Sequence, residues 1–316
     1  MASEASAFYP IGTPGTPWVE VERSAWKAQT KTQRSYQEEV LGKIEKMKET
    51  MIVEQYGSLP HDPDRYPLFA VKPGEWQPDK PHVLVTGGVH GYETSGVQGA
   101  LLFLQTKAQE YAKDFNIVVA PCVSPWAYER IQRWQADSED PNRSFQREKQ
   151  TDESKALMDY LDQLNVPQWT CHVDLHETTD TDATEFRPAR QAKAGLTYTP
   201  SGIPDGFYLV GDSTNPQLDF QQAIIDSVRK VTHIAPPDNA EKNTMIGEPL
   251  VQEGVILVPT QTLGLCGGVT GGSYTATTEV YPNSHRATDE ICNQAQVAAV
   301  VGALDYILSQ QECSTK

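Results

Sequence analysis

Short apolar runs alternate with longer segments of helical periodicity along most of the chain. The runs have the length of buried strands, and the longer segments carry apolar residues at spacings of three and four. We expect strands at residues 66–72, 82–88, 116–122, 169–175, 206–210, 255–258 and 275–281. We expect helices at residues 33–54, 94–111, 152–164, 217–232 and 288–308. This alternation predicts an α/β fold, a single domain in which a mixed, mostly parallel central sheet has helices on both faces.

The chain length suits one such domain preceded by a short arm. The chain has 316 residues, of which 38% are apolar, so it can bury a large core. Residues 1–32 are rich in Pro, Gly, Ser and Thr, and we expect them to wrap the surface as an N-terminal arm. Strands 66–72 and 82–88, separated by a turn that contains Pro and Gly, are expected to form an antiparallel pair.

Charge and cysteine content limit the partners and the compartment. The net charge of −16 argues against nucleic acid or an anionic membrane as a partner, because both are repelled over long range. No signal peptide and no run of membrane-spanning length is evident, which predicts a cytoplasmic protein. The five cysteines are odd in number and form no Cys-x-x-Cys, which indicates reduced, mostly buried thiols. A mature secreted form would look similar, and the oligomeric state is not predicted.

The apolar run at Val83 ends in two glycines, and a histidine and a glutamate follow in His90-Gly91-Tyr92-Glu93. At positions i and i+3 at the start of a helix, an imidazole and a carboxylate lie on one face and can reach one cation. Such a pair also occurs by chance on many surface helices. The turn is therefore half of a metal site only if other segments supply the remaining ligands.

A second histidine ends another predicted strand, in Val173-Asp174-Leu175-His176. The carboxyl ends of parallel strands meet at one edge of a sheet, where open α/β folds place their sites, so His90 and His176 can meet there. With Glu93 they provide two nitrogens and one carboxylate, the protein ligand set of a catalytic zinc ion that keeps a fourth position for water. Asp174 either orients His176 or is an ordinary buried acid.

Three further segments carry candidate substrate-binding or catalytic side chains. Arg133 and the pair Asn142-Arg143, which follows a proline, can donate parallel hydrogen bonds to a carboxylate, although solvated arginines are the ordinary alternative. Glu279 lies in a predicted strand, where it either faces water or acts as a general base whose pKa is raised by partial burial.

Together these segments resemble the zinc metallocarboxypeptidase family M14, the carboxypeptidase A type. The likeness includes Gly88 to Glu93, the tract Asp140-Pro141-Asn142-Arg143-Ser144-Phe145, His176 and Glu279, and it extends over residues 50 to 310. The resemblance implies a catalytic domain at residues 33–316 with one zinc ion per chain, which hydrolyses the C-terminal amide bond of peptides.

The resemblance also implies a role for each site residue. His90, Glu93 and His176 are expected to bind zinc, and Glu279 to be the base that activates water. Arg133 is expected to stabilise the oxyanion, Asn142 and Arg143 to hold the terminal carboxylate, and Asp140 to orient the first zinc histidine.

Several features differ from the digestive members of that family. The interval between Glu93 and His176 is shorter, and no tyrosine matches the one that covers the substrate. Glu177 directly after His176 is more similar to the aspartoacylase and succinylglutamate desuccinylase branch of the same fold. An amidohydrolase of N-acyl amino acids is therefore the second hypothesis, and a catalytically inactive relative that binds peptide tails is the third.

Overall fold

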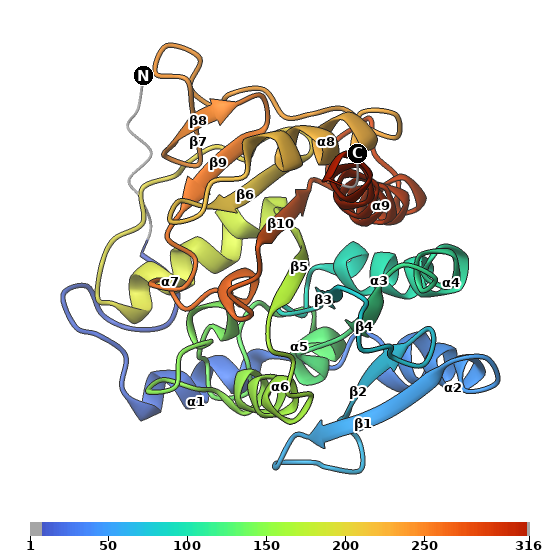
Figure 1. Ribbon diagram of the computed structural model, residues 1–316. Coiled ribbons are helices and arrows are strands. Elements are labelled where there is room, and N and C mark those ends of the chain that lie inside the picture. Colours follow the sequence, from blue (N-terminus) through green and yellow to red (C-terminus); the bar gives the residue numbers. More distant parts are fainter. Residues whose placement is uncertain (1–7, 315–316) are drawn as a thin grey trace.

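Within residues 8–314, which the computed structural model describes, a ten-stranded mixed sheet runs through the molecule in the order β1-β2-β4-β3-β5-β10-β6-β9-β8-β7 (Figure 1). The strands are β1 (Ile52–Ser58), β2 (Pro67–Lys72), β3 (His82–Gly87), β4 (Asn116–Ala120), β5 (Trp169–Glu177), β6 (Tyr208–Asp212), β7 (Thr244–Met245), β8 (Glu248–Gln252), β9 (Val255–Val258) and β10 (Tyr274–Val280). The central strands β4, β3, β5 and β10 are parallel neighbours, and antiparallel pairs flank them. The predicted α/β fold with a mostly parallel centre is confirmed.

Helices cover both faces of the sheet, because alternate residues of each central strand enter different cores. In β3, Val83 and Val85 pack in one core, whereas Leu84 packs in the other. The first core is covered by α2 (Gly42–Met47), α3 (Thr94–Thr106), α8 (Leu218–Val228) and α9 (Asp289–Ser314), and the second by α6 (Asp152–Gln163). The other helices are α1 (Glu20–Gln29), α4 (Ala108–Tyr111), α5 (Pro125–Arg130) and α7 (Arg187–Lys193), with short π or 3-10 turns η1 (Gln37–Leu41), η2 (Pro141–Arg143), η3 (Asp182–Phe186) and η4 (Cys266–Gly268).

Two expectations about the first quarter of the chain are wrong. Strands β2 and β3 are not paired, because β4 lies between them, parallel to β3 and antiparallel to β2. The helix expected at residues 33–54 ends at Met47, and Ile52 already begins β1, which is antiparallel to β2. A turn intervenes, and the β-branched pair Ile52-Val53 suits the strand better than a helix.

The predicted N-terminal arm, residues 1–32, is only partly described, since residues 1–7 lie outside the described range. It contains the helix α1, so the first helix comes earlier than expected. Trp26 of α1 is buried against Trp126 and Trp134, with ring centroids 6.3 Å and 5.4 Å away. This contact fixes the arm next to α5 and the segment that carries Arg133. The boundary at residue 32 stays a prediction.

Among the described residues, α9 is the one helix that is long and apolar enough to cross a membrane, over Asp289–Gln311, and half of that stretch is buried inside the molecule. Figure 1 shows α9 beside α8 and α3. Its buried positions include Ala295, Ala299 and Ala303, one helical turn apart, which gives close contact with these neighbours. The apolar composition of α9 is accounted for by this packing.

The described cysteines are consistent with reduced thiols. Cys122, Cys171, Cys266 and Cys292 are buried and unpaired. The side chain of Cys313 lies outside the described residues. The predicted cytoplasmic location stays a prediction.

Candidate metal centre and active site

The loop after β3 places the first two predicted ligands. Gly88 has a φ of +63°, a conformation that favours glycine, and it turns the chain away from the sheet. A Cβ on Gly91 would lie 2.0 Å from the carbonyl carbon of Ala127 in α5, so only glycine fits where the loop packs. The helix begins at Thr94, and Glu93 has non-helical angles. The two ligands therefore meet across a tight loop and not, as expected, along a helical turn.

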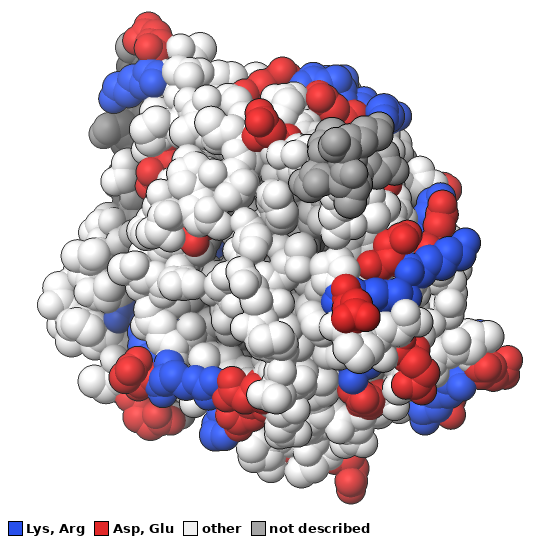
Figure 2. Space-filling model, viewed as in Figure 1, with Lys and Arg blue, Asp and Glu red and all other residues white. Residues whose placement is uncertain are grey.

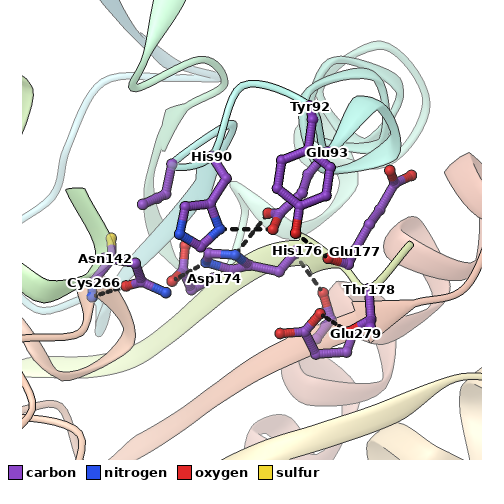
Figure 3. Close-up of polar contacts among 12 residues, drawn as sticks. His90, Tyr92, Glu93, Asn142, Asp174, His176, Glu177, Thr178, Cys266 and Glu279 are labelled. Carbon is purple, nitrogen blue, oxygen red and sulfur yellow. Dashed lines mark hydrogen bonds and ion pairs between the residues drawn. The ribbon is translucent and has the colours of Figure 1, made fainter. Parts of the chain in front are cut away.

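His90, Glu93 and His176 converge at the carboxyl edge of the sheet (Figure 3). Nδ1 of His90 lies 2.7 Å from Oε1 of Glu93, and Nδ1 of His176 lies 2.7 Å from Oε2 of the same carboxylate. All three side chains are at most 2% exposed. Potential ligand atoms of the three lie within 4.8 Å of one another.

The donor set fits a divalent metal. Among the described residues, the buried Oε2 of Glu93 has no hydrogen bond of good geometry, although Nδ1 of His176 lies 2.7 Å away. Burial alone would raise the pKa of Glu93, but the neighbouring His176 and His90 lower it to about 2. An ionised carboxylate between two imidazole nitrogens is suited to a cation. The structure thus brings together the three predicted ligands as a candidate metal site.

Each histidine is held from its outer side by an aspartate. Nε2 of His90 lies 3.0 Å from Oδ1 of Asp140, and Nε2 of His176 lies 2.8 Å from Oδ2 of Asp174. Burial disfavours the charged form of Asp140, but Arg133 and His90 outweigh it and hold the pKa of Asp140 well below its usual range. An ionised carboxylate only accepts hydrogen bonds, so each Nε2 carries the proton. Each Nδ1 faces the Glu93 carboxylate and is the atom that a metal would bind in place of the proton shared with Glu93.

Glu279 lies beside these ligands, on the neighbouring strand. It is in register with His176 across the parallel pair β10 and β5, so both side chains project from the same face. Thr178 donates a hydrogen bond of 2.8 Å to Oε2 of Glu279. Burial and the negative charge of Glu93 raise the pKa of Glu279 to about 8. Glu279 is only partly exposed and faces the candidate ligands, so the alternative of a fully solvated strand glutamate does not describe this position.

The three side chains predicted to contact the substrate, Arg133, Asn142 and Arg143, differ in how firmly neighbouring residues hold them. Arg133 donates from Nε to Asp140 over 3.1 Å and lies 3.6 Å from Asp182, so two carboxylates fix it. The side-chain oxygen of Asn142 accepts a 2.8 Å hydrogen bond from the backbone of Cys266. Arg143 is only partly exposed and, among the described residues, has no ion pair; burial lowers its pKa. The guanidinium of Arg143 therefore keeps its charge available for an anionic group of a ligand.

Sequence reasoning missed the partners that complete the site. The hydroxyl of Tyr92 donates to Asp182 over 2.9 Å and contacts Nη1 of Arg133 at 3.3 Å. Tyr92 stands inside the recognised turn and could have been considered, but Asp182 has no sequence signal. Glu177 accepts hydrogen bonds from the backbone of Thr94 and Ser95, and it caps α3 instead of facing the ligands. Burial raises its pKa to about 7.

Comparison with known proteins finds one matching family profile and several solved structures with a similar fold. Residues 79–195 match the profile of the succinylglutamate desuccinylase/aspartoacylase catalytic domain. The search of curated proteins found no match. A candidate metallopeptidase of Shewanella denitrificans OS217 is 18% identical with a TM-score of 0.63, over 84% of this chain and 88% of its own.

Two further solved structures extend the comparison. A candidate metallopeptidase of Shewanella amazonensis SB2B is 18% identical with a TM-score of 0.62, over 84% of this chain and 90% of its own. Bovine thrombin-activatable fibrinolysis inhibitor, solved in complex with tick carboxypeptidase inhibitor, is 14% identical with a TM-score of 0.58, over 90% of this chain and 99% of its own. These similarities show that the chain has a carboxypeptidase-like fold.

The matched segment covers only part of the candidate site. Residues 79–195 contain the three candidate ligands, Asp140 and the anchors Arg133, Asn142 and Arg143. Glu279 lies beyond it, on β10. The position of Glu279 therefore rests on its register with His176 alone.

Proposed function

We propose that the protein is a zinc-dependent hydrolase that cleaves an amide bond next to a free carboxylate, and that its principal substrates are the C-terminal ends of peptides. The observation that carries this proposal is the convergence of two Nδ1 atoms on one carboxylate, with Glu279 in register beside them. Two imidazoles and one carboxylate are a donor set that catalytic zinc sites use.

Each polar group of the site has a proposed task. A bound zinc ion would polarise the scissile carbonyl and acidify water. Glu279 accepts the proton of the attacking water and passes it to the leaving amine, a task for which a raised pKa is suited. Arg143 and the amide of Asn142 bind the substrate carboxylate, because they are close in the chain and the guanidinium has no ion pair among the described residues.

Arg133 is proposed to stabilise negative charge on the carbonyl oxygen. Asp140 and Asp182 hold its guanidinium in place, so little reorganisation is needed when the charge develops. Asp140 and Asp182 also neutralise part of the positive charge of Arg133. We therefore expect Arg133 to act on the carbonyl oxygen mainly by donating directed hydrogen bonds.

An amidohydrolase of N-acyl amino acids is the second candidate. The match of residues 79–195 to the succinylglutamate desuccinylase/aspartoacylase profile favours it. The similarity to solved metallopeptidases over 84% of the chain supports the peptidase candidate. The inactive peptide-binding relative is disfavoured, because ligands, base and arginines are all present.

The test combines metal analysis with a substrate panel. The protein is stripped with a chelator, reloaded with zinc and assayed on peptides with free C-termini, on the same peptides with amidated C-termini, and on N-acyl amino acids. The proposal expects zinc-dependent release of the C-terminal residue from free peptides only. Turnover of N-acyl amino acids without peptide cleavage would select the second candidate, and binding without any product the third.

A further inference from the structure

A fully buried polar cluster lies directly behind His176, where β3, β5 and η4 meet. It consists of Thr86, His172, Asp174 and Cys266, all of them completely buried. The hydroxyl oxygen of Thr86 lies 2.6 Å from Oδ1 of Asp174, 2.9 Å from Nε2 of His172 and 3.6 Å from Sγ of Cys266. The threonine hydroxyl is therefore the common partner of the other three groups.

The directions of these hydrogen bonds follow from what each group can donate. Burial lowers the pKa of His172 to about 4, so its imidazole is neutral near pH 7. Thr86 donates its single hydroxyl proton to Oδ1 of Asp174 over 2.6 Å. His172 and Cys266 must then donate to the lone pairs of the hydroxyl, through Nε2–H and S–H. This pattern uses every hydrogen-bonding position of the Thr86 hydroxyl.

Both oxygens of Asp174 are thereby occupied. Oδ1 accepts from Thr86, and Oδ2 accepts from Nε2 of His176 at 2.8 Å. A carboxylate fixed at both oxygens cannot rotate away from the imidazole, so Nε2 of His176 stays hydrogen-bonded to Asp174 and Nδ1 stays directed toward Glu93, where a metal would bind. In this way the Thr86 hydroxyl acts on the candidate metal site through one intervening residue.

The same cluster extends to the substrate side. The backbone N–H of Cys266 donates to the side-chain oxygen of Asn142 over 2.8 Å (Figure 3). Because a backbone donor requires an oxygen acceptor, this bond fixes which end of the Asn142 amide faces Cys266. The NH₂ end is then the one left for a ligand.

We propose that Thr86 is a positioning residue of the metal centre, which holds Asp174 against His176 and thereby raises metal affinity; this inference rests on the proposed metal site. Potential ligand atoms of His172, Asp174 and Cys266 also lie within 4.8 Å of one another, so a second metal is the competing interpretation. The Thr86 oxygen contacts all three of these groups and takes the central position that a metal would need. The cluster is thus a hydrogen-bond network centred on the Thr86 hydroxyl, and in this proposal it does not bind a second metal.

The test compares Thr86→Val, which keeps the shape but lacks the hydroxyl, with Thr86→Ser, which keeps the hydroxyl. The zinc dissociation constant of each folded protein is measured by competition with a chromophoric chelator, and the zinc content is counted. Loss of an outer partner of a metal ligand typically weakens metal binding about 10- to 100-fold, so we expect that loss for Thr86→Val and near-normal affinity for Thr86→Ser. We expect one zinc ion per chain in all three proteins.

The melting temperature of the metal-free proteins separates positioning from simple stabilisation. A purely structural role would lower this temperature in Thr86→Val but leave the dissociation constant unchanged, and that result would overturn the proposal. A second zinc equivalent that is lost in Cys266→Ser would overturn it in favour of a second metal site. Failure to bind zinc at all would refute the proposed function together with the inference.

A measurement on the unchanged protein covers the case in which Thr86→Val does not fold. Nitrogen NMR of the zinc-loaded protein reports which ring nitrogen of each histidine carries the proton. The proposal expects Nε2–H on both His172 and His176. A proton on Nδ1 of His172 with a bare Nε2 facing Thr86 would contradict it.

Discussion

His90 and Asp140 are far apart in the chain, yet Nε2 of His90 lies 3.0 Å from Oδ1 of Asp140. The second oxygen of the same carboxylate accepts a hydrogen bond from Nε of Arg133 at 3.1 Å. One aspartate therefore orients both a candidate metal ligand and the candidate oxyanion donor. The same Oδ1 also accepts a hydrogen bond of 3.0 Å from the backbone N–H of Asn142, two residues further along the chain.

Replacing Asp140 with asparagine should weaken metal binding. The amide oxygen can still accept from His90, but the amide lacks the negative charge, and its NH₂ group, which replaces Oδ2, cannot accept the hydrogen bond from Nε of Arg133. We expect the zinc dissociation constant to rise about tenfold or more. Chelator competition measures this, with Asp159→Asn on α6, a partly exposed aspartate paired with Lys155, as the control. Equal zinc affinity in Asp140→Asn and in the control would contradict the role given to Asp140.

Replacing Glu279 with glutamine should abolish most turnover while zinc is retained. A positioned general base contributes roughly 10²- to 10⁴-fold to rate, so kcat should fall by that range. Zinc content and dissociation constant should stay near those of the unchanged protein, because Glu279 is not among the candidate ligands. Near-normal turnover in this variant would remove Glu279 from the mechanism.

The pH dependence of kcat/KM gives a separate check on Glu279. Without metal, burial and Glu93 raise its pKa to about 8, and a bound cation lowers it again. Since the carboxylate form is required, activity falls as the pH drops through this pKa. We expect the acid limb between the ordinary glutamate value of about 4.3 and about 8. An acid limb that persists unchanged in Glu279→Gln would assign it to another group.

Replacing Arg143 with methionine should raise KM more than it lowers kcat. The guanidinium has no ion pair among the described residues and is assigned to the substrate carboxylate, whose binding precedes the chemical step. Loss of a charge-assisted hydrogen bond costs about 1.5–3 kcal/mol, which corresponds to roughly a tenfold to hundredfold loss in kcat/KM. Arg147→Met, at an exposed position, is the matched control. A loss confined to kcat would instead place Arg143 in the chemical step.

The sequence indicates the ligands of this site but not their surroundings. His90, Glu93 and His176 could be predicted, because strand ends with metal-binding side chains follow from local spacing and from the geometry of parallel sheets. The insertion of β4 between β2 and β3 could not, because pairing between distant strands has no local pattern. Likewise, Thr86 and Cys266 look like ordinary residues of a strand and a loop. Their role arises only where three segments converge.

The end of the helix expected at residues 33–54 shows a different limit. Tyr36, Val40, Ile44 and Met47 are buried with helical spacing, as predicted. Met51 continues the same spacing by coincidence, although the chain has already turned before β1. Periodicity identifies the buried face of an element reliably, but its ends depend on turns that leave a weaker trace.

Replacing Glu153 with glutamine should stabilise the protein at alkaline pH. Glu153 lies in the first turn of α6 and is 2% exposed, and burial, with Asp137 and Asp152 nearby, raises its pKa well above the usual value. The folded state therefore holds this proton more tightly than the unfolded chain. Its contribution to stability is fully present below the unfolded pKa and is lost as the pH rises through the folded pKa.

Urea unfolding at pH 5 and pH 8 tests this expectation. Each unit of difference between the folded and unfolded pKa corresponds to about 1.4 kcal/mol, so the unchanged protein should lose free energy of unfolding between these values. Glutamine has the same shape and no charge, so Glu153→Gln should lose less over the same interval. The exposed Glu49→Gln serves as the control and should follow the unchanged protein. If Glu153→Gln follows the unchanged protein too, the pKa of Glu153 is not raised in the folded state, and the expectation is contradicted.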